Sequence, residues 1–311
     1  MPRAKRADVV AAGLRGIVVH ALRPAGGVCV ATHGMMADHR TLAPARRPGL
    51  ADLLAERGLH VVCLDLPRHG RNADIGWDLE RMVRAQFPDA VAEIARRFPG
   101  LPIVLLGHSL GGVLWLASLA VADPALSVAG LVTVNTNVWC PRSDRNPLRI
   151  AAKRALLASM RVLARGGDVP ARRYRLGTND VPREFLTDLV RWSRRGWTLH
   201  EGGDALDERL ATTHVPVLAM TTRGDRLLCV PQVARWLHAR LPAVEQLLLP
   251  GPARHMDLVT EAATSYRQHW TRPIEWITAR CDRPGGTSSA DLADWSHSCD
   301  QVPGESKKRQ R

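Results

Sequence analysis

The chain has 311 residues, of which 45% are hydrophobic, and it carries a formal net charge of +13. This length and apolar content suffice for one large α/β domain or two small ones, and they exclude a chain that is disordered throughout. The positive charge raises nucleic acid as a partner, but the arginines are spread through the predicted helices, and no zinc-finger or RNA-binding motif accompanies them. We therefore expect no specific nucleic-acid partner.

The six cysteines do not form a recognisable framework. No C-x-x-C pair occurs, and Cys29 and Cys63 lie inside apolar runs, so neither a disulfide scaffold nor a zinc site is indicated. Arg15 interrupts the apolar stretch near the N-terminus, and no apolar run is long enough to cross a membrane. These features predict a cytoplasmic protein without a transmembrane segment, and they leave its oligomeric state open.

Apolar runs alternate with helix-like segments through the first part of the chain. Strand-like runs cover residues 28–32, 59–66, 101–106 and 128–134, and helix-like segments between them cover residues 49–57, 88–97 and 115–122. Apolar runs without polar alternation are typical of strands that are buried on both faces. Their alternation with helices predicts βαβ units and a mainly parallel sheet.

The alternation stops after residue 135 and resumes near residue 215. Residues 138–213 are rich in arginine and helix-like, without a clear buried strand, which predicts an inserted segment. Strand-like runs then cover residues 215–221 and 244–249, and helix-like segments cover residues 231–240 and 262–279. We therefore predict a core formed by residues 1–137 and 214–280, and a disordered basic tail over residues 281–311 that ends in KKRQR.

The segment GHSLGG, residues 107–112, lies between a predicted strand and a predicted helix. A G-x-S-x-G sequence at such a turn is typical of a strained, exposed serine, because the glycines leave room where strand and helix crowd each other. The turn also places the serine at a helix N-terminus, where backbone N–H groups favour developing negative charge. A dinucleotide-binding loop would require G-x-G-x-x-G instead. Ser109 is therefore the predicted nucleophile.

A serine nucleophile needs a histidine that takes its proton and a carboxylate that orients this histidine. Asp225 follows the predicted strand 215–221, and His255 follows the predicted strand 244–249. Loops after strand ends are where α/β sheets assemble their sites, and the order serine, acid, histidine is the one that α/β-hydrolases use. Asp225 is therefore the predicted acid and His255 the predicted base.

His33 and Gly34 follow the predicted strand 28–32, where a hydrolase loop contributes one N–H group to an oxyanion hole. We expect the two donors to be the backbone N–H groups of Met35 and Leu110. Three further histidines near these motifs are expected to pack or to shape loops: His33, His69 and His108.

The chain resembles the α/β-hydrolase superfamily over residues 8–280 in five segments: THGMM, DLPRHGRN, GHSLGG and the loops of Asp225 and His255. The combination of HG, D-x-x-x-HG and GHS-x-GG is similar to that of its monoacylglycerol-lipase and lysophospholipase-like branch. The resemblance implies an α/β-hydrolase fold, with helices on both faces of the central sheet, and the roles of nucleophile, acid and base for Ser109, Asp225 and His255. It also implies that residues 138–213 form a helical cap. We expect no metal and no organic cofactor, because the triad needs none.

The insertion has apolar and basic residues at helical spacing. Its apolar residues are expected on one face: Leu156, Leu157, Met160, Leu163, Phe185, Leu189, Trp192 and Trp197. Its arginines are expected on a solvated face: Arg149, Arg154, Arg161, Arg165 and Arg191. An apolar underside would exclude water and accept an acyl chain, although the same residues could simply pack the insertion onto the core.

Together these features predict a serine hydrolase that cleaves lipid-like or other apolar carboxylic esters through an acyl-enzyme on Ser109. Thioester cleavage and amide or peptide cleavage by the same three residues stay open, and so does a hydrolase-like binding module without activity. Aspartate-based dehalogenase and epoxide-hydrolase chemistry is disfavoured, because serine occupies the nucleophile position. Peripheral contact of the basic tail with a membrane surface or another anionic partner stays open as well.

Overall fold

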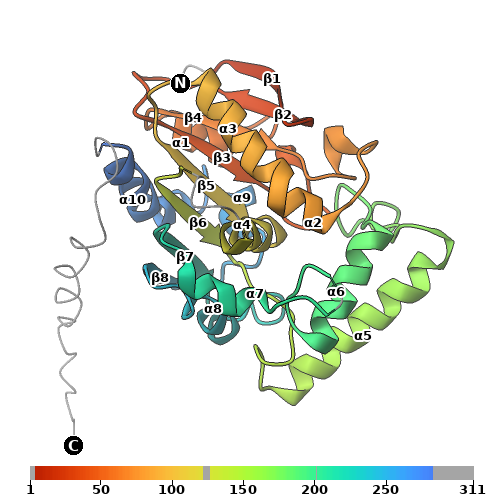
Figure 1. Cartoon of the computed structure of the whole chain (residues 1–311). Coiled ribbons are helices and arrows are strands. Elements are labelled where there is room, and N and C mark those ends of the chain that lie inside the picture. Colours follow the sequence, from red (N-terminus) through yellow and green to blue (C-terminus); the bar gives the residue numbers. More distant parts are fainter. Residues whose placement is uncertain (1–3, 122–126, 201, 283–311) are drawn as a thin grey trace, which may run out of the picture.

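The computed structural model describes residues 4–121, 127–200 and 202–282, which are built around an eight-stranded sheet (Figure 1). The strands are β1 (Arg6–Ala11), β2 (Leu14–Val19), β3 (Gly27–Thr32), β4 (Leu59–Leu64), β5 (Ile103–His108), β6 (Gly130–Val134), β7 (Val217–Thr222) and β8 (Val244–Leu249). Their order across the sheet is β1-β2-β4-β3-β5-β6-β7-β8. Strands β3 to β8 are parallel to one another, whereas β2 is antiparallel to both of its neighbours. The prediction of a mainly parallel sheet is confirmed.

Helices cover both faces of the sheet (Figure 1). In chain order they are α1 (Leu50–Ala55), α2 (Leu79–Arg81), α3 (Phe87–Arg97), α4 (Leu110–Val121), α5 (Pro147–Leu163), α6 (Arg183–Arg195), α7 (Leu206–Arg209), α8 (Pro231–His238), α9 (Asp257–Thr260) and α10 (Thr271–Cys281). Side chains of β5 alternate between the two faces. Leu105 packs in one buried cluster with residues of α3 and α4, and Val104 and Leu106 pack in a second cluster with residues of α1 and α10. The apolar run that predicted this strand is thus buried on both sides.

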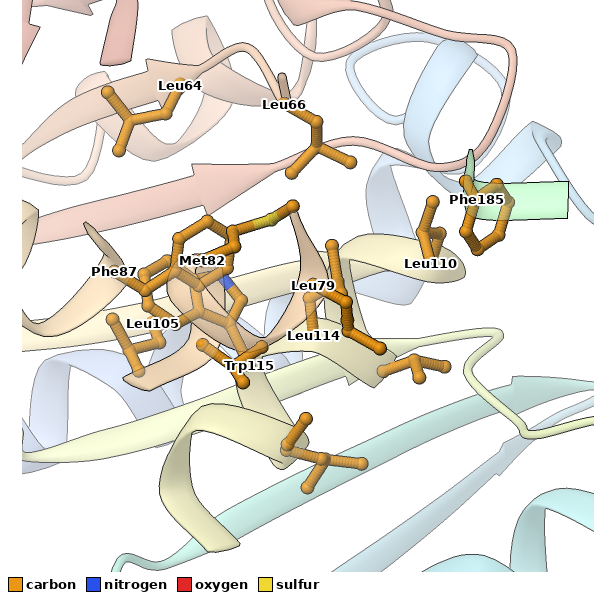
Figure 2. Close-up of a cluster of buried hydrophobic side chains, with 14 of the residues drawn as sticks. Leu64, Leu66, Leu79, Met82, Phe87, Leu105, Leu110, Leu114, Trp115 and Phe185 are labelled. Carbon is orange, nitrogen blue, oxygen red and sulfur yellow. The ribbon is translucent and has the colours of Figure 1, made fainter. Parts of the chain in front are cut away.

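The cluster on the α4 face holds the largest buried aromatic side chains near the nucleophile turn (Figure 2). The rings of Phe87 and Trp115 lie 4.3 Å apart between centroids. The same cluster continues to Leu110, directly after Ser109, and to Phe185 of α6. Full burial of each such side chain contributes roughly 1.5–3 kcal/mol. This packing holds the start of α4 rigidly against the sheet.

Residues between β6 and β7 contain α5, α6 and α7, and α5 and α6 lie against each other beyond the edge of the sheet (Figure 1). The Asn146 side chain begins α5 by accepting hydrogen bonds from the N–H groups of Leu148 and Arg149. This segment, residues 138–213, is called the insertion below. Its exact limits and those of the core remain predictions.

Side chains of the insertion follow the predicted division into faces only in part. Leu157, Met160 and Phe185 are buried, but Leu163 is 37% exposed, so its placement on the apolar face is wrong. Arg191 is largely buried, because its guanidinium pairs with Asp188 and hydrogen-bonds to backbone carbonyls. A long side chain near a helix end can satisfy its charge inside the fold in this way.

The sequence predicts a helix over residues 262–279, and the structure contradicts the first half of it. α10 begins only at Thr271, with Pro273 in its first turn. Proline lacks an N–H group and is tolerated only in the first turn of a helix, so α10 cannot extend far upstream. At the other end, Cys281 closes α10, and residues 283–311 of the predicted tail lie outside the described residues.

Candidate active site

Ser109 lies between β5 and α4 with a backbone φ of 51°. This left-handed conformation costs of order 1–3 kcal/mol for a residue with a Cβ atom, so its surroundings must hold it. A Cβ on Gly107 would lie 2.4 Å from the Cα of Gly112, and a Cβ on Gly111 would lie 2.5 Å from the Oγ1 of Thr32. Strand and helix approach so closely that only glycine fits at these positions.

Asp225 and His255 lie on the loops after β7 and β8. The Nε2 of His255 is 2.9 Å from the Oγ of Ser109, and its Nδ1 is 2.5 Å from the Oδ2 of Asp225. These three side chains come from the carboxyl ends of parallel strands, which all meet at one edge of the sheet. Residues that are 146 positions apart in the chain thereby form one hydrogen-bonded series.

The Asp225 carboxylate is buried, with a side chain that is 3% exposed. Burial by itself raises the pKa of this carboxyl, but hydrogen bonds and charge from His255, together with backbone N–H groups, outweigh it and lower the pKa below its ordinary value. One of these backbone donors is the N–H group of Leu228, 3.0 Å from Oδ1. An ionised Asp225 accepts the Nδ1–H of His255, which leaves Nε2 as the acceptor for the Ser109 hydroxyl.

The backbone N–H groups of Met35 and Leu110 have no acceptor within the part of the chain that the structure describes, and neither do those of Gly34 and Met36 on the same loop. The loop of Met35 touches the nucleophile turn, because a Cβ on Gly34 would lie 3.2 Å from the Cβ of Ser109. The N–H of Gly111 also donates to the carbonyl of His33 at 3.1 Å, which ties the start of α4 to this loop. The N–H groups of Met35 and Leu110 are thus free to bind an oxygen.

His33 is fully buried, and both of its ring nitrogens bind backbone groups. Its Nδ1–H donates to the carbonyl of Gly34 at 2.8 Å, and its Nε2 accepts the N–H of Leu66 at 3.1 Å. Burial lowers the pKa of His33, so the ring is neutral and holds two loops together. His69 likewise donates from Nδ1 to the carbonyl of Pro67, at 2.8 Å.

Asn135 is not among the site residues predicted from the sequence, but the structure places it in contact with the loop of His255. Asn135 directly follows β6 with a φ of 45°, and its Nδ2 donates to the backbone carbonyl of His255 at 2.9 Å. The Nε2–H of His108 donates to the same carbonyl at 3.0 Å, and burial lowers the pKa of His108 to about 3. The loop of His255 is thus fixed from two neighbouring strands. An asparagine directly after a buried strand is the one signal that could have identified this residue.

The insertion is hydrogen-bonded to the loop that carries Met35. The side chain of Asn179 accepts the N–H of Gly70 at 2.8 Å and donates to the carbonyl of Ala37 at 3.0 Å. The backbone N–H of Asn179 donates to the carbonyl of Met36 at 3.1 Å. The position of this loop therefore depends on the insertion as well as on the core.

Apolar side chains of the insertion approach the nucleophile turn. Phe185 is buried against Trp77, with ring centroids 4.9 Å apart, and it belongs to the same cluster as Leu110 (Figure 2). The indole N–H of Trp77 donates to Asp188 of α6 at 2.9 Å. Phe185 and Asp188 of the insertion thus both contact Trp77 of the core, and Phe185 lies in the cluster that contains Leu110.

Three further features of the described residues concern metal binding, membrane-spanning helices and the cysteines. No group of three or more His, Cys, Asp or Glu side chains in this part of the chain is placed to hold a metal ion. No helix among these residues combines the length and apolar character needed to cross a membrane. The cysteines within the described ranges are all buried, free thiols: Cys29, Cys63, Cys140, Cys229 and Cys281.

Solved structures with the same fold include several hydrolases. The chain is similar to a soluble variant of the monoglyceride lipase from Saccharomyces cerevisiae, with a TM-score of 0.63 and 15% identity over 90% of this chain and 96% of that one. It is similar to the monoacylglycerol lipase of Paleococcus ferrophilus, with a TM-score of 0.55 and 17% identity over 90% and 100% of the two chains. A serine hydrolase involved in carbazole degradation gives a TM-score of 0.56 and 16% identity over 89% and 99%.

These structural matches, at low sequence identity, establish the fold. The sequence comparisons identify the family. No curated protein matches the sequence. Residues 23–261 match the family described as serine aminopeptidase, S33, and this range contains Ser109, Asp225 and His255. The predicted α/β-hydrolase fold and the resemblance to that superfamily are thereby confirmed. The chain belongs to the serine aminopeptidase S33 family of α/β-hydrolases.

Proposed function

We propose that the protein is a serine hydrolase that cleaves carboxylic esters through an acyl-enzyme on Ser109. The observation that supports this most directly is the series of hydrogen bonds from Ser109 Oγ to His255 Nε2, 2.9 Å, and from His255 Nδ1 to Asp225 Oδ2, 2.5 Å. A serine hydroxyl is a weak nucleophile at its ordinary pKa, and a neutral histidine at hydrogen-bonding distance removes that obstacle.

In the first half of the reaction, His255 takes the proton of Ser109 as the oxygen attacks the ester carbonyl. The tetrahedral oxyanion accepts hydrogen bonds from the N–H groups of Met35 and Leu110, which have no other acceptor among the described residues. Asp225 stabilises the imidazolium that forms at His255. The C–O bond to the alcohol then breaks, and His255 Nε2 gives its proton to the leaving alkoxide.

In the second half, water replaces the alcohol. His255 takes a proton from this water as its oxygen attacks the acyl carbon, and the same two N–H groups bind the second oxyanion. The bond to Ser109 Oγ breaks, His255 returns the proton to the serine, and the carboxylic acid leaves. The contacts of Asn135 and His108 with the carbonyl of His255 keep the ring in place for all four proton transfers.

The insertion acts in this proposal as a cap over Ser109. Its apolar side near the site, with Phe185 next to Trp77 in the cluster that contains Leu110, suits an apolar acyl chain better than a small polar one. Its hydrogen bonds to the loop of Met35 connect the cap to the segment that carries an oxyanion donor.

Peptide cleavage is the alternative that the family description suggests. An aminopeptidase has to bind the ammonium group of its substrate, for which a carboxylate is the suited partner. The cavity beside Asp225 is instead lined by Arg149, Arg223, Arg226 and Arg235. Neither Ser109 nor His255 lines this cavity, so the choice between an ester and a peptide rests on the comparison of substrates below.

Rates on matched p-nitrophenyl esters of increasing chain length, the corresponding thioester and the corresponding anilide test this proposal. We expect the ester to be cleaved fastest, with kcat/KM rising with acyl length, and Ser109→Ala to lose at least about 10³-fold in kcat. Ser159→Ala removes an exposed hydroxyl from α5 and should leave the rate unchanged. Faster cleavage of the anilide would reject the ester assignment, and full activity of Ser109→Ala would reject the nucleophile.

A further inference from the structure

A cavity of about 530 Å³ lies beside Asp225 and is lined mainly by arginines. Arg149 comes from α5 of the insertion, Arg223 and Arg226 come from the loop after β7, and Arg235 comes from α8. Residues from three separate elements thus place four guanidinium groups around one space. The proposed triad and oxyanion hole give these arginines no role.

The positive charge of this cavity is largely uncompensated. Arg149 is occupied by Asp144, with Nε 2.9 Å from Oδ2 and Nη2 2.8 Å from Oδ1. The other three arginines are exposed to solvent, and their guanidinium groups have no hydrogen-bonding or ion-pair partner among the described residues: Arg223, Arg226 and Arg235. Asp225 is the one carboxylate in the wall, and it is already bound to His255.

The chemistry of these groups selects a multivalent anion. Guanidinium groups bind phosphate and carboxylate oxygens through pairs of hydrogen bonds. A phosphoryl group carries about −1.5 to −2 charges near neutral pH and three acceptor oxygens, whereas a carboxylate carries a single charge. Three unpaired guanidinium groups therefore match a phosphoryl group better than a lone carboxylate.

The cavity has room for a ligand larger than free phosphate. Cavities that hold small organic ligands have volumes of roughly 300–1,000 Å³, and this one lies within that range. We propose that the cavity binds a small phosphorylated molecule, with its phosphoryl group held by Arg223, Arg226 and Arg235. The ligand is either a phosphorylated ester substrate or a separate phosphorylated effector, and both present the same group to the arginines.

Calorimetric titration of the full-length protein with inorganic pyrophosphate, at fixed ionic strength, tests the site. We expect saturable binding that Arg223→Gln/Arg235→Gln weakens at least tenfold. The matched control is Arg81→Gln/Arg96→Gln, which removes the same charge from exposed positions on α2 and α3 outside the cavity and should bind as the wild type does. Should the first pair not fold, the exposed Arg226→Gln tests the same site.

Three results would overturn the proposal: no saturable binding, equal weakening by both pairs of substitutions, or acetate binding as tightly as pyrophosphate. Equal weakening would mean that pyrophosphate responds only to net charge. Because the titration does not depend on catalysis, Ser109→Ala should bind pyrophosphate with unchanged affinity. Binding by a protein that cleaves no ester would therefore reject the proposed function and leave this site intact.

Kinetics with 1-acylglycerol and 1-acylglycerol 3-phosphate distinguish the two sources of the phosphoryl group, and this arm rests on the proposed function. If the phosphate belongs to the substrate, Arg223→Gln/Arg235→Gln raises KM at least tenfold for the phosphorylated ester alone. If it belongs to an effector, the substitutions leave both KM values unchanged without pyrophosphate, and pyrophosphate alters the rate with the neutral ester in the wild type but not in Arg223→Gln/Arg235→Gln. Either result supports the site, whereas rates that respond neither to pyrophosphate nor to the substitutions contradict its assignment to a substrate or an effector of this enzyme.

Discussion

Asn135 shows how one side chain can position a catalytic group without touching the substrate. It bridges the carbonyl of His255, at 2.9 Å, and the N–H of Thr222, at 3.2 Å, and so links the loop after β8 to the end of β7. Its left-handed backbone is a conformation that asparagine adopts more readily than most residues. The Nε2 of His255 must stay at hydrogen-bonding distance from Ser109, and this bridge limits its movement.

We therefore predict that Asn135→Ala lowers kcat about 10- to 100-fold with little change in KM, because misplacement by a fraction of an ångström weakens proton transfer. Steady-state kinetics with a p-nitrophenyl ester measure both constants. Asn137→Ala is the matched control, since Asn137 is close in sequence and its Nδ2 has no hydrogen-bonding partner among the described residues. A rise in KM with unchanged kcat would show that Asn135 serves binding rather than the position of His255.

The contact between β3, β5 and α4 is the part of the fold on which the nucleophile turn depends. A Cβ at Gly111 would lie 2.5 Å from Thr32 Oγ1 and 2.7 Å from the carbonyl oxygen of His33. An alanine would push α4 away from the loop of Met35. Replacement of glycine by alanine within a helix is ordinarily stabilising, so a destabilising effect here would be a specific consequence of this contact.

We predict that Gly111→Ala lowers the free energy of unfolding by about 1–3 kcal/mol and reduces kcat at least about tenfold. Urea denaturation and steady-state kinetics measure the two effects. Gly166→Ala, where a Cβ would have no neighbour within 4 Å, should change neither quantity. If Gly111→Ala were as stable and as active as the wild type, the close approach would not constrain the turn.

Six of the eight strands could be predicted from the sequence, and the first two could not. The runs over residues 101–106 and 128–134 identify β5 and β6, in which every residue is buried. β8 lies at the opposite edge and only its Leu249 is buried, but three successive leucines identify it. β1 and β2 were not predicted, since they lie at the antiparallel edge of the sheet, where Asp8 and Arg15 interrupt the apolar pattern. A run of apolar residues indicates a buried strand, and a strand at the edge of a sheet buries fewer of its residues.

The site residues also form two groups: those that a local sequence pattern identifies, and those that only long-range contacts bring together. The turn of Ser109 has a local motif, and the loops of Asp225 and His255 follow predictable strands, so these residues could be proposed from the sequence. Asn135 and the arginine-lined cavity could not, because their contacts join residues of elements that are far apart in the chain. Only the folded sheet brings such residues together.

At the scale of the whole molecule, buried neutral histidines link stability to pH. His238 is buried between the carbonyl of Ala234, at 2.7 Å, and the hydroxyl of Thr133, at 2.9 Å, and burial lowers its pKa from 6.5 to about 4. The unfolded chain therefore binds a proton at a higher pH than the native one. This contribution to stability is complete above about pH 6.5 and is lost as the pH falls toward about 4.

We predict that His238→Gln narrows the difference between the free energies of unfolding at about pH 7.5 and about pH 4.5 by about 2 kcal/mol. Urea denaturation at the two pH values measures it, and the same replacement at the exposed His214 is the control. The wild type should still lose stability in acid, because burial also lowers the pKa of His69 to about 4. A difference that stays the same in His238→Gln would contradict the neutral, buried state of this ring.

The central claim is that Ser109 forms a covalent intermediate, and intact-mass spectrometry after reaction with a fluorophosphonate tests it most directly. We predict one adduct per chain, located by peptide mapping at Ser109 within GHSLGG, absent from Ser109→Ala, and retained in the control Ser159→Ala. His255→Gln should form the adduct far more slowly, because the reagent needs the same activated oxygen as an ester. An active protein that gains no mass, or an adduct that persists in Ser109→Ala, would contradict the account.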